Sequence, residues 1–352
     1  MSYELNEKIK NLTPYDPIEG NYRVRLDANE AFSAPNAEMM EKIHEAIDDV
    51  AFNRYPDPSA SKLCELFARY YGINKENVTA GNGSDELISI IAGSFLQKGD
   101  KAVTLAPDFS MYGFYLGIYE CENIVVQKKD YKIDADEVIK TVNDNSASML
   151  IFSNPCNPTS ILLDEADVRK IIENVDALVV LDEAYMDFAT GSLIQSVNEY
   201  DNLIVLRTCS KAVGMASIRL GFAVANERIT RALKSVKSPY NVNSVSQAIG
   251  ERIFSDSVYV DSCISRICTS RDLLLEELKK VEKRHPDKFT IIASQANFVY
   301  NKSNQSKEIF EFLKTKGIIV RCFGDHLRIS AGRNHENIEV AALIDEFLGG
   351  VE

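Results

Sequence analysis

The sequence predicts an α/β protein with a large domain, built on a mostly parallel sheet covered by helices, and a smaller α+β domain. Short apolar runs rich in Val and Ile alternate with longer amphipathic stretches, which is typical of parallel strands buried on both faces. The pattern changes in the last hundred residues, where a long helical stretch precedes pairs of neighbouring strands. The length of 352 residues is enough for two domains.

The expected elements follow in order along the chain. In the large domain, strands are expected over 102–106, 124–127, 148–153, 177–181, 203–206 and 221–225, with helices over 86–95, 134–142 and 164–174. An amphipathic stretch from 258 to about 282 then leads to strands over 289–293 and 297–300. A helix over 307–316, strands over 318–321 and 327–330, and a helix over 337–347 complete the pattern.

The composition excludes several classes of partner. Lys and Arg number 39 and Asp and Glu number 52, which gives a net charge of −13. A protein this acidic lacks the basic surface that nucleic acid or an anionic membrane would need. No apolar run approaches the ~20 residues that span a bilayer, and the first residues do not have the pattern of a secretory signal.

The cysteines and histidines indicate neither a disulfide framework nor a metal site. The seven cysteines are scattered and form no Cys-x-x-Cys pair, and the four histidines lie far apart in the sequence. We therefore expect a cytoplasmic protein with reduced thiols and no bound metal.

Two charged residues follow apolar strands and are candidate catalytic groups, because ligands of open α/β sheets bind at the carboxyl ends of the strands. Asp182 ends the run 177–181, where a carboxylate needs a cationic partner unless it only caps a helix. Lys211 lies just past the run 202–206, where partial burial would lower its pKa and free the amine as a nucleophile. Taken alone, such a lysine is more often a solvated loop residue.

Two loops could bind a ligand through backbone or amide groups. Residues 80–85 read Ala-Gly-Asn-Gly-Ser-Asp before an expected helix, so their N–H groups could hold a phosphate, although capping alone accounts for most such turns. Residues 153–160 read Ser-Asn-Pro-Cys-Asn-Pro-Thr-Ser, and the two Asn-Pro steps form a rigid turn that can aim a side-chain amide or simply be a tight loop.

Together and in this order, these features resemble the pyridoxal-phosphate aminotransferases of fold type I. The resemblance covers nearly the whole chain and rests on Asn157-Pro-Thr, Asp182-Glu-Ala-Tyr185, Ser210-Lys211 and Arg219-Leu-Gly-Phe222. Within this family it is closest to the histidinol-phosphate aminotransferases, on Leu26-Asp-Ala-Asn-Glu30, Asn53-Arg-Tyr-Pro and Gly317-Ile-Ile-Val-Arg321. It implies a seven-stranded sheet in a large domain over 46–240, a small domain over 241–352, and an N-terminal arm over 1–45 that includes part of the small domain.

The resemblance implies pyridoxal phosphate as the cofactor. Lys211 would bind the cofactor's aldehyde covalently and later carry the proton between the substrate Cα and the cofactor C4′. Asp182 would pair with the pyridine nitrogen, while Tyr185 and Asn157 would hydrogen-bond the phenolic oxygen of the ring. Phe109 would stack on the ring, unless it is only a core aromatic. The residues that would hold the cofactor phosphate are Gly83, Ser84, Asp85, Thr208, Ser210 and Arg219.

The resemblance also implies a substrate and an assembly. Arg328 would bind the substrate α-carboxylate through its planar guanidinium, and Asn29 would lie at the substrate edge of the site. Arg321 would contact the distal phosphate of the substrate, unless it is a surface arginine. Tyr55 would reach the cofactor phosphate of the neighbouring subunit, which implies a homodimer with shared active sites. The implied reaction belongs to histidine biosynthesis and converts L-histidinol phosphate and 2-oxoglutarate to imidazole-acetol phosphate and L-glutamate.

The chain departs from the family pattern in ways that bear on the substrate. Ser160 stands where the family usually has Gly after Asn-Pro-Thr, and Ala31 and Phe32 follow Ala-Asn-Glu where Asn and Pro are common. An aromatic amino acid aminotransferase and a threonine-phosphate decarboxylase therefore stay open as alternatives. A non-enzymatic cofactor sensor is disfavoured, because the motif set is complete and the pattern starts too early to leave room for a DNA-binding module.

Overall fold

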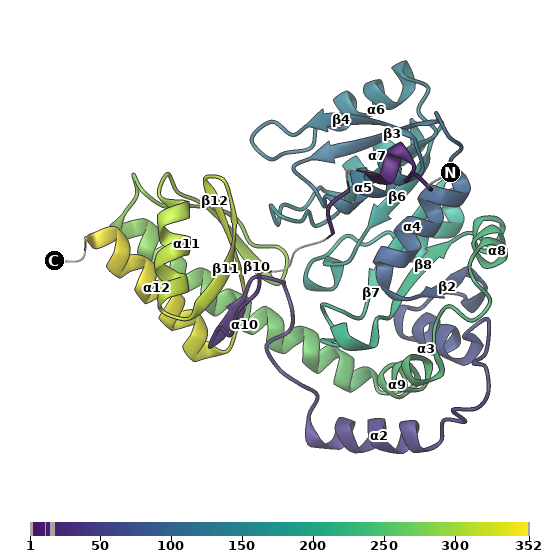
Figure 1. Cartoon of the computed structure of the whole chain (residues 1–352), viewed down its shortest axis with the longest axis horizontal. Helices are drawn as coiled ribbons and strands as arrows, with labels where there is room; N and C mark the ends of the chain where they lie inside the picture. The colour runs from purple at the N-terminus through teal and green to yellow at the C-terminus, as the bar shows by residue number, and fades with distance from the viewer. Residues whose placement is uncertain (1–2, 11, 15–17, 351–352) are drawn as a thin grey trace.

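The large domain is built on one seven-stranded sheet (Figure 1). The computed structural model describes residues 3–10, 12–14 and 18–350. In spatial order the strands are β2 (Val78–Gly81), β8 (Gly221–Ala225), β7 (Leu203–Thr208), β6 (Leu178–Asp182), β5 (Met149–Ser153), β3 (Lys101–Ala106) and β4 (Glu122–Gln127). Strand β8 runs antiparallel to both of its neighbours, and the other strands of this sheet run parallel to one another.

Helices cover both faces of this sheet because its central strands are apolar on both sides; every residue of β5 and β7 is buried. One face packs against α4 (Gly83–Phe95), α5 (Met111–Ile118) and α8 (Glu227–Val236). The other face packs against α3 (Ser61–Tyr71), α6 (Ala135–Asp144), α7 (Glu165–Glu173) and α9 (Ser244–Phe254). This arrangement leaves the carboxyl edge of the parallel strands as the place where loops and polar groups collect.

The small domain is a five-stranded sheet with helices on one face. Its strands, in spatial order, are β1 (Val24–Leu26), β11 (Ile318–Phe323), β12 (His326–Ser330), β10 (Phe298–Lys302) and β9 (Thr290–Ala293). Strand β1 is parallel to β11, and the other pairs are antiparallel. In Figure 1 this early strand lies beside the late strands of the chain. The covering helices are α10 (Ser257–Arg284), α11 (Ser306–Thr315) and α12 (Asn334–Gly349).

Helix α10 joins the two domains, and Figure 1 shows it running from beside α9 into the small domain. Near its start Val260 belongs to the core of the large domain, whereas Leu274 and Leu278 are buried in the core of the small domain. The predicted domain limits stay predictions, and those at residues 1 and 352 lie outside the described residues. The remaining elements are α1 (Glu7–Lys10), α2 (Ala37–Asp48), η1 (Lys75–Asn77), η2 (Met186–Phe188), η3 (Ile194–Glu199) and η4 (Ala216–Ile218).

The predicted fold class is confirmed. Each strand and helix expected from the apolar patterns is present, with ends shifted by up to a few residues. Strands β1 and β2 are additional, because runs of three and four residues are too short to show a period. None of the helices in the described part of the chain is long and apolar enough to cross a bilayer.

Candidate active site

Charged and polar residues form a row along the carboxyl edge of the large sheet. Lys128 follows β4, Asp108 lies just past β3, Ser153 ends β5, and Asp182 ends β6. Lys211 follows β7, the next strand in the row. Ser153 and Asp182 are direct neighbours across β5 and β6. The row has this order because parallel strands end at the same edge of a sheet.

Asp182 is a buried carboxylate with an unusually high affinity for a proton. Its Oδ2 accepts a hydrogen bond from the Tyr112 hydroxyl at 2.7 Å, and its Oδ1 accepts one from the backbone N–H of Ala184 at 3.1 Å. Burial raises the pKa of Asp182 to about 6, although both hydrogen bonds favour the ionised form. Such a carboxylate can hold a partner that carries a positive charge.

Lys211 has a lowered pKa and points toward the N-terminal segment. Its Nζ donates to the carbonyl oxygen of Ala28 at 3.0 Å. Burial, together with the positive charges of Arg328 and Arg219, lowers the pKa of Lys211 to about 8. A larger fraction of this amine than of an ordinary lysine is therefore uncharged near neutral pH, and the uncharged form is the one that acts as a nucleophile or a base.

The hydroxyl of Tyr185 is held by the small domain and the N-terminal segment. The Asn29 amide donates to it at 2.9 Å, and the Ser330 hydroxyl donates to the amide oxygen of Asn29 at 3.0 Å. The pKa of Tyr185 is raised by burial, against the effect of the nearby Arg328 cation. Asn29 adopts φ 55°, a left-handed conformation that Asn tolerates better than most residues.

Two arginines lie side by side on one face of the small sheet. Arg328 on β12 is paired directly with Arg321 on β11, so their side chains project from the same face. Arg328 donates to the Asn157 amide oxygen and to the carbonyl oxygen of Asp27, both at 2.6 Å. This corner joins residues from both domains and is rich in positive charge, as binding of an anion requires.

A second cationic corner lies where β2 meets α4. Gly83 has φ +81°, and a Cβ there would come within 2.8 Å of Arg219 Nη2. Arg219 also donates to the Ser210 hydroxyl at 3.3 Å, and the Ser210 N–H donates to the Thr208 hydroxyl. A Cβ at Gly221 would strike the backbone between Gly83 and Ser84. This cradle of N–H groups, hydroxyls and a guanidinium at a helix N-terminus could hold a phosphate.

Asp85 and Phe109 complete the predicted cofactor set. Asp85 Oδ2 accepts from the Tyr115 hydroxyl at 3.0 Å, whereas its buried Oδ1 has no hydrogen-bond partner. The ring of Phe109 packs edge-on against Tyr112, with centroids 5.5 Å apart, so it lies beside the group that contacts Asp182.

Tyr55 lies on the surface. Its side chain is 80% exposed and stacks on Tyr240 at 4.5 Å between ring centroids. The next residue, Asn241, accepts a hydrogen bond from Asn82, which precedes Gly83. These contacts connect Tyr55, through Tyr240 and Asn241, to the edge of the phosphate cradle of its own subunit, but Tyr55 itself makes none of the contacts of the cradle described above.

Sequence reasoning missed Lys128 and Asp108 of the row and Tyr112 beside it. Tyr112 contacts Asp182, and Lys128 forms an ion pair with Asp108 at 3.1 Å in which both side chains are 1% exposed. The signal that marked Lys211, a charged residue just past an apolar strand, is also present at Lys128. Among residues 3–10, 12–14 and 18–350, no group of three or more His, Cys, Asp and Glu side chains could hold a metal ion.

The profile of the family described as aminotransferase class I and II matches residues 23–343. The chain belongs to this family. The aminotransferase is 43% identical to histidinol-phosphate aminotransferase of Clostridium novyi (strain NT) over 97% of this chain and 96% of that protein. It is 38% identical to histidinol-phosphate aminotransferase of Clostridium kluyveri over 97% of this chain and 98% of that protein. The family expected from the sequence motifs is confirmed.

Solved structures show the same fold. The crystal structure of histidinol-phosphate aminotransferase from Sinorhizobium meliloti, in complex with pyridoxal-5′-phosphate, superposes with a TM-score of 0.89. The alignment covers 100% of this chain and 99% of that one, at 22% identity. A Thermus thermophilus aspartate aminotransferase mutant gives a TM-score of 0.81 at 18% identity, over 99% of both chains.

The residues of the aminotransferase fit pyridoxal phosphate. The Gly83–Arg219 cradle suits a phosphate, because a side chain at Gly83 would fill the space that faces the guanidinium. Asp182 suits a protonated ring nitrogen, since no Lys or Arg among the described residues forms an ion pair with it within 4 Å. Lys211 suits an aldehyde, because its amine is partly uncharged.

Proposed function

We propose that this aminotransferase uses pyridoxal phosphate to convert L-histidinol phosphate and 2-oxoglutarate to imidazole-acetol phosphate and L-glutamate. The observation that carries the proposal is the adjacent pair Arg321 and Arg328, of which Arg328 is close enough to Lys211 to lower the pKa of its amine. L-Histidinol phosphate has no carboxylate, so its anion is the phosphate ester, with up to two charges. Two neighbouring guanidiniums match this phosphate and can also take the carboxylates of 2-oxoglutarate. The names of the relatives at 38–43% identity support this substrate.

The amino-group chemistry needs a base, an electron sink and a fixed orientation. When bound, the cofactor supplies an aldehyde for the amino group and a ring that accepts electron density. Lys211 would hold the aldehyde at rest and would take up and return a proton at the substrate Cα. Asp182 would stay ionised and pair with the protonated ring nitrogen. Tyr185 and Asn157 would donate hydrogen bonds to the phenolic oxygen of the cofactor, and Phe109 would pack against its ring.

The phosphate of the cofactor defines one end of the site. Arg219 would supply the positive charge, and Asp85 lies in the first turn of the helix at whose N-terminus the cradle stands. The other residues of the cradle are Gly83, Ser84, Thr208 and Ser210. We include a homodimer in the proposal, with Tyr55 reaching the phosphate bound in the neighbouring subunit. The 80% exposure of Tyr55 and the 75% exposure of Phe52 support an interface here, since large exposed aromatics favour contact with another protein surface.

A cytoplasmic location is the last part of the proposal. All seven cysteines lie in the described part of the chain, and each is free. Free thiols persist in reducing compartments.

A single half-reaction tests the proposed function. The protein loaded with pyridoxal phosphate is mixed with L-histidinol phosphate in the absence of 2-oxoglutarate, and the visible absorbance of the lysine-bound cofactor is followed. We expect its rapid loss, with phenylalanine and O-phospho-L-threonine much slower. If only phenylalanine or tyrosine converted the cofactor rapidly, the transamination chemistry would stand and the assignment of L-histidinol phosphate as substrate would be wrong. Absence of lysine-bound cofactor would overturn the role of Lys211.

A further inference from the structure

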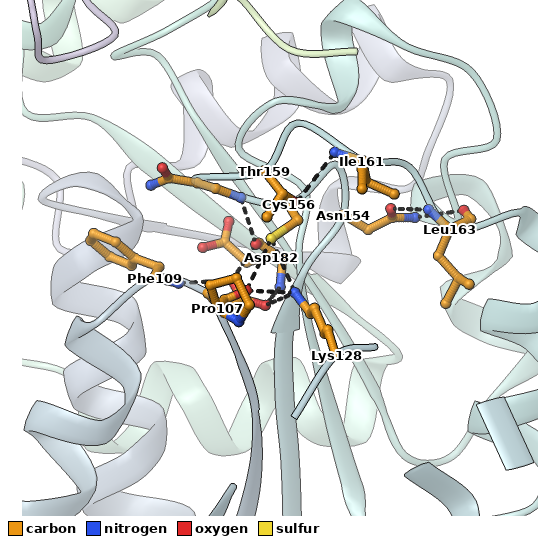
Figure 2. A network of polar contacts seen from close by, with 12 residues as sticks. Pro107, Phe109, Lys128, Asn154, Cys156, Thr159, Ile161, Leu163 and Asp182 are labelled. Carbon is orange, nitrogen blue, oxygen red and sulfur yellow. Dashed lines mark hydrogen bonds and ion pairs between the residues drawn. The ribbon is translucent and has the colours of Figure 1, made fainter. Parts of the chain in front are cut away.

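A buried ion pair lies next to the active site, and the mechanism above does not use it (Figure 2). Lys128 donates to the Asp108 carboxylate at 3.1 Å, to the Pro107 carbonyl oxygen at 2.9 Å, and to Cys156 Sγ at 3.0 Å. These three contacts account for the three protons of its ammonium group. A buried ion pair adds little net stability, because removing both charges from water costs about as much as their attraction returns. Stability alone therefore does not explain this pair.

The pair is connected to two cofactor-contacting residues. Asp108 Oδ1 accepts from the backbone N–H of Phe109 at 2.8 Å and from the hydroxyl of Ser153. The Ser153 hydroxyl in turn accepts from the backbone N–H of Asn157 at 3.1 Å. Thus one carboxylate, fixed by Lys128, sets the backbone position of both Phe109 and Asn157.

The pair also controls the charge that acts on Asp182. The titratable side chains that interact with Asp182 include Tyr112, Asp108, Glu183, Tyr185 and Lys211. Of the two acids in this set, Asp108 has Lys128 as its buried cation, whereas Glu183 shares Arg207 with Asp187. By compensating Asp108, Lys128 removes one of the negative charges that favour protonation of Asp182.

We propose that Lys128, acting through Asp108, is a positioning residue of the active site: it fixes Phe109 and Asn157 against the cofactor and keeps Asp182 ionised. This inference rests on the proposed function, because it assigns Lys128 a role toward the bound pyridoxal phosphate. Lys128 itself does not touch the reacting atoms.

The test compares Lys128→Met with a matched control, Lys129→Met. Lys129 is the next residue, 78% exposed and paired only with Glu137 on the surface. The full-length variants are examined by equilibrium dialysis with pyridoxal phosphate and by kinetics of the loaded enzyme, both as a function of pH. In Lys128→Met, the uncompensated charge of Asp108 raises the pKa of Asp182. We therefore expect the acid limb of the pH profile, where cofactor affinity and kcat fall as the pH is lowered, to shift upward by about one pH unit.

We also expect kcat of Lys128→Met to fall about tenfold at neutral pH with a smaller change in KM, because the substrate arginines are untouched. Lys129→Met should match the wild type in every readout. A folded Lys128→Met protein with wild-type kcat and an unmoved acid limb would overturn the inference. A general loss of stability would lower the thermal midpoint without moving that limb, and this result would also count against the proposal.

Ser153→Ala provides a second route should Lys128→Met not fold. It removes the link from Asp108 to Asn157 and leaves the Lys128–Asp108 charges balanced. We expect about a threefold or larger loss of cofactor affinity and of kcat/KM, with the acid limb in its wild-type position. Wild-type affinity and kcat/KM would overturn the positioning role. Failure of the proposed function is distinguishable from these results, because it would be visible in the wild-type protein before any variant is compared.

Discussion

Arg328 donates to the side-chain oxygen of Asn157 at 2.6 Å, and this contact joins the small sheet to a loop of the large one. The same guanidinium donates to the carbonyl oxygen of Asp27, in the N-terminal segment. One planar group therefore holds three parts of the chain together at the substrate side of the site. Its planar fork of donors allows this.

Arg328→Lys should keep the charge and lose this geometry. A lysine ammonium cannot reproduce the two hydrogen bonds and also bind an anion through two parallel contacts. We expect kcat/KM for 2-oxoglutarate to fall by about 100-fold, while the absorbance of the bound cofactor stays unchanged. Steady-state kinetics and an absorbance spectrum check this. Arg23→Lys, at a surface pair with Glu339, is the control. A loss below about threefold in Arg328→Lys would remove this arginine from carboxylate binding.

Lys211→Met should abolish turnover and at the same time stabilise the cofactor-free protein. The pKa of Lys211 is about 8 when folded and 10.5 in its ordinary range, so the unfolded chain binds a proton more tightly. In the wild type, burial of this amine costs no folding stability above about pH 10.5, where it is uncharged in both states. Stability is lost as the pH falls from there through 8, because only the unfolded chain takes up the proton readily. At about pH 7 we expect the variant to gain about 1–3 kcal/mol, and less at about pH 10.

Urea unfolding at the two pH values measures the gain of Lys211→Met. An equal gain at both would show that the amine titrates normally in the folded protein. The variant should still bind pyridoxal phosphate through the phosphate cradle, which equilibrium dialysis checks.

Ser160 provides a test of backbone strain. Its φ of 60° is in the left-handed region, and its hydroxyl accepts from the backbone N–H groups of Gln295 at 2.6 Å and Ala296 at 2.8 Å. Ser160→Ala keeps the strain and removes the acceptor, so we expect a loss of about 1–2 kcal/mol in the free energy of unfolding. Ser160→Gly removes both, and should be less destabilising by about 1 kcal/mol. Urea unfolding of both variants decides this; equal losses would contradict the strain.

The shared active site can be tested by mixing two inactive proteins. In a dimer made only of Tyr55→Ala subunits, or only of Lys211→Ala subunits, both active sites carry the substitution and lose activity. In a mixed dimer with shared sites, one site has both changes and the other has neither. Random exchange should therefore restore up to about a quarter of the wild-type activity. Activity no higher than that of the unmixed variants would place Tyr55 outside the partner's site.

The sequence predicted most of the fold because the buried strands are nearly continuous apolar runs. Strand β1 escaped prediction, since Val24–Leu26 is three residues long and has an exposed arginine at its centre. Its position depends on pairing with β11, almost the whole chain away. A local pattern carries no information about such a partner.

The candidate site was predictable where a motif was present. Asp182 and Lys211 were singled out by their places just past apolar strands and then by family motifs, and Arg328 by the resemblance alone. Lys128 and Asp108 were missed, although each lies just past a strand. Lys128 belongs to no matching motif, Asp108 was passed over beside Phe109 in the segment Pro107-Asp-Phe, and their pairing comes only from the order of β4 and β3 in the sheet. The preference for glycine at position 160 likewise became explicable only once the φ of Ser160 was known.

The pairing of β1 with β11 also bears on how the protein is made. Val24 faces Ile318, so the ribosome must add nearly three hundred residues before the first strand can find its neighbour. The large sheet can close in the meantime, because its strands all lie between these two segments. During this interval the apolar side chains of β1 have no partner strand to pack beside, and contacts this distant in sequence form slowly. The sheet of the small domain therefore cannot be completed until β11 and β12 have been synthesised.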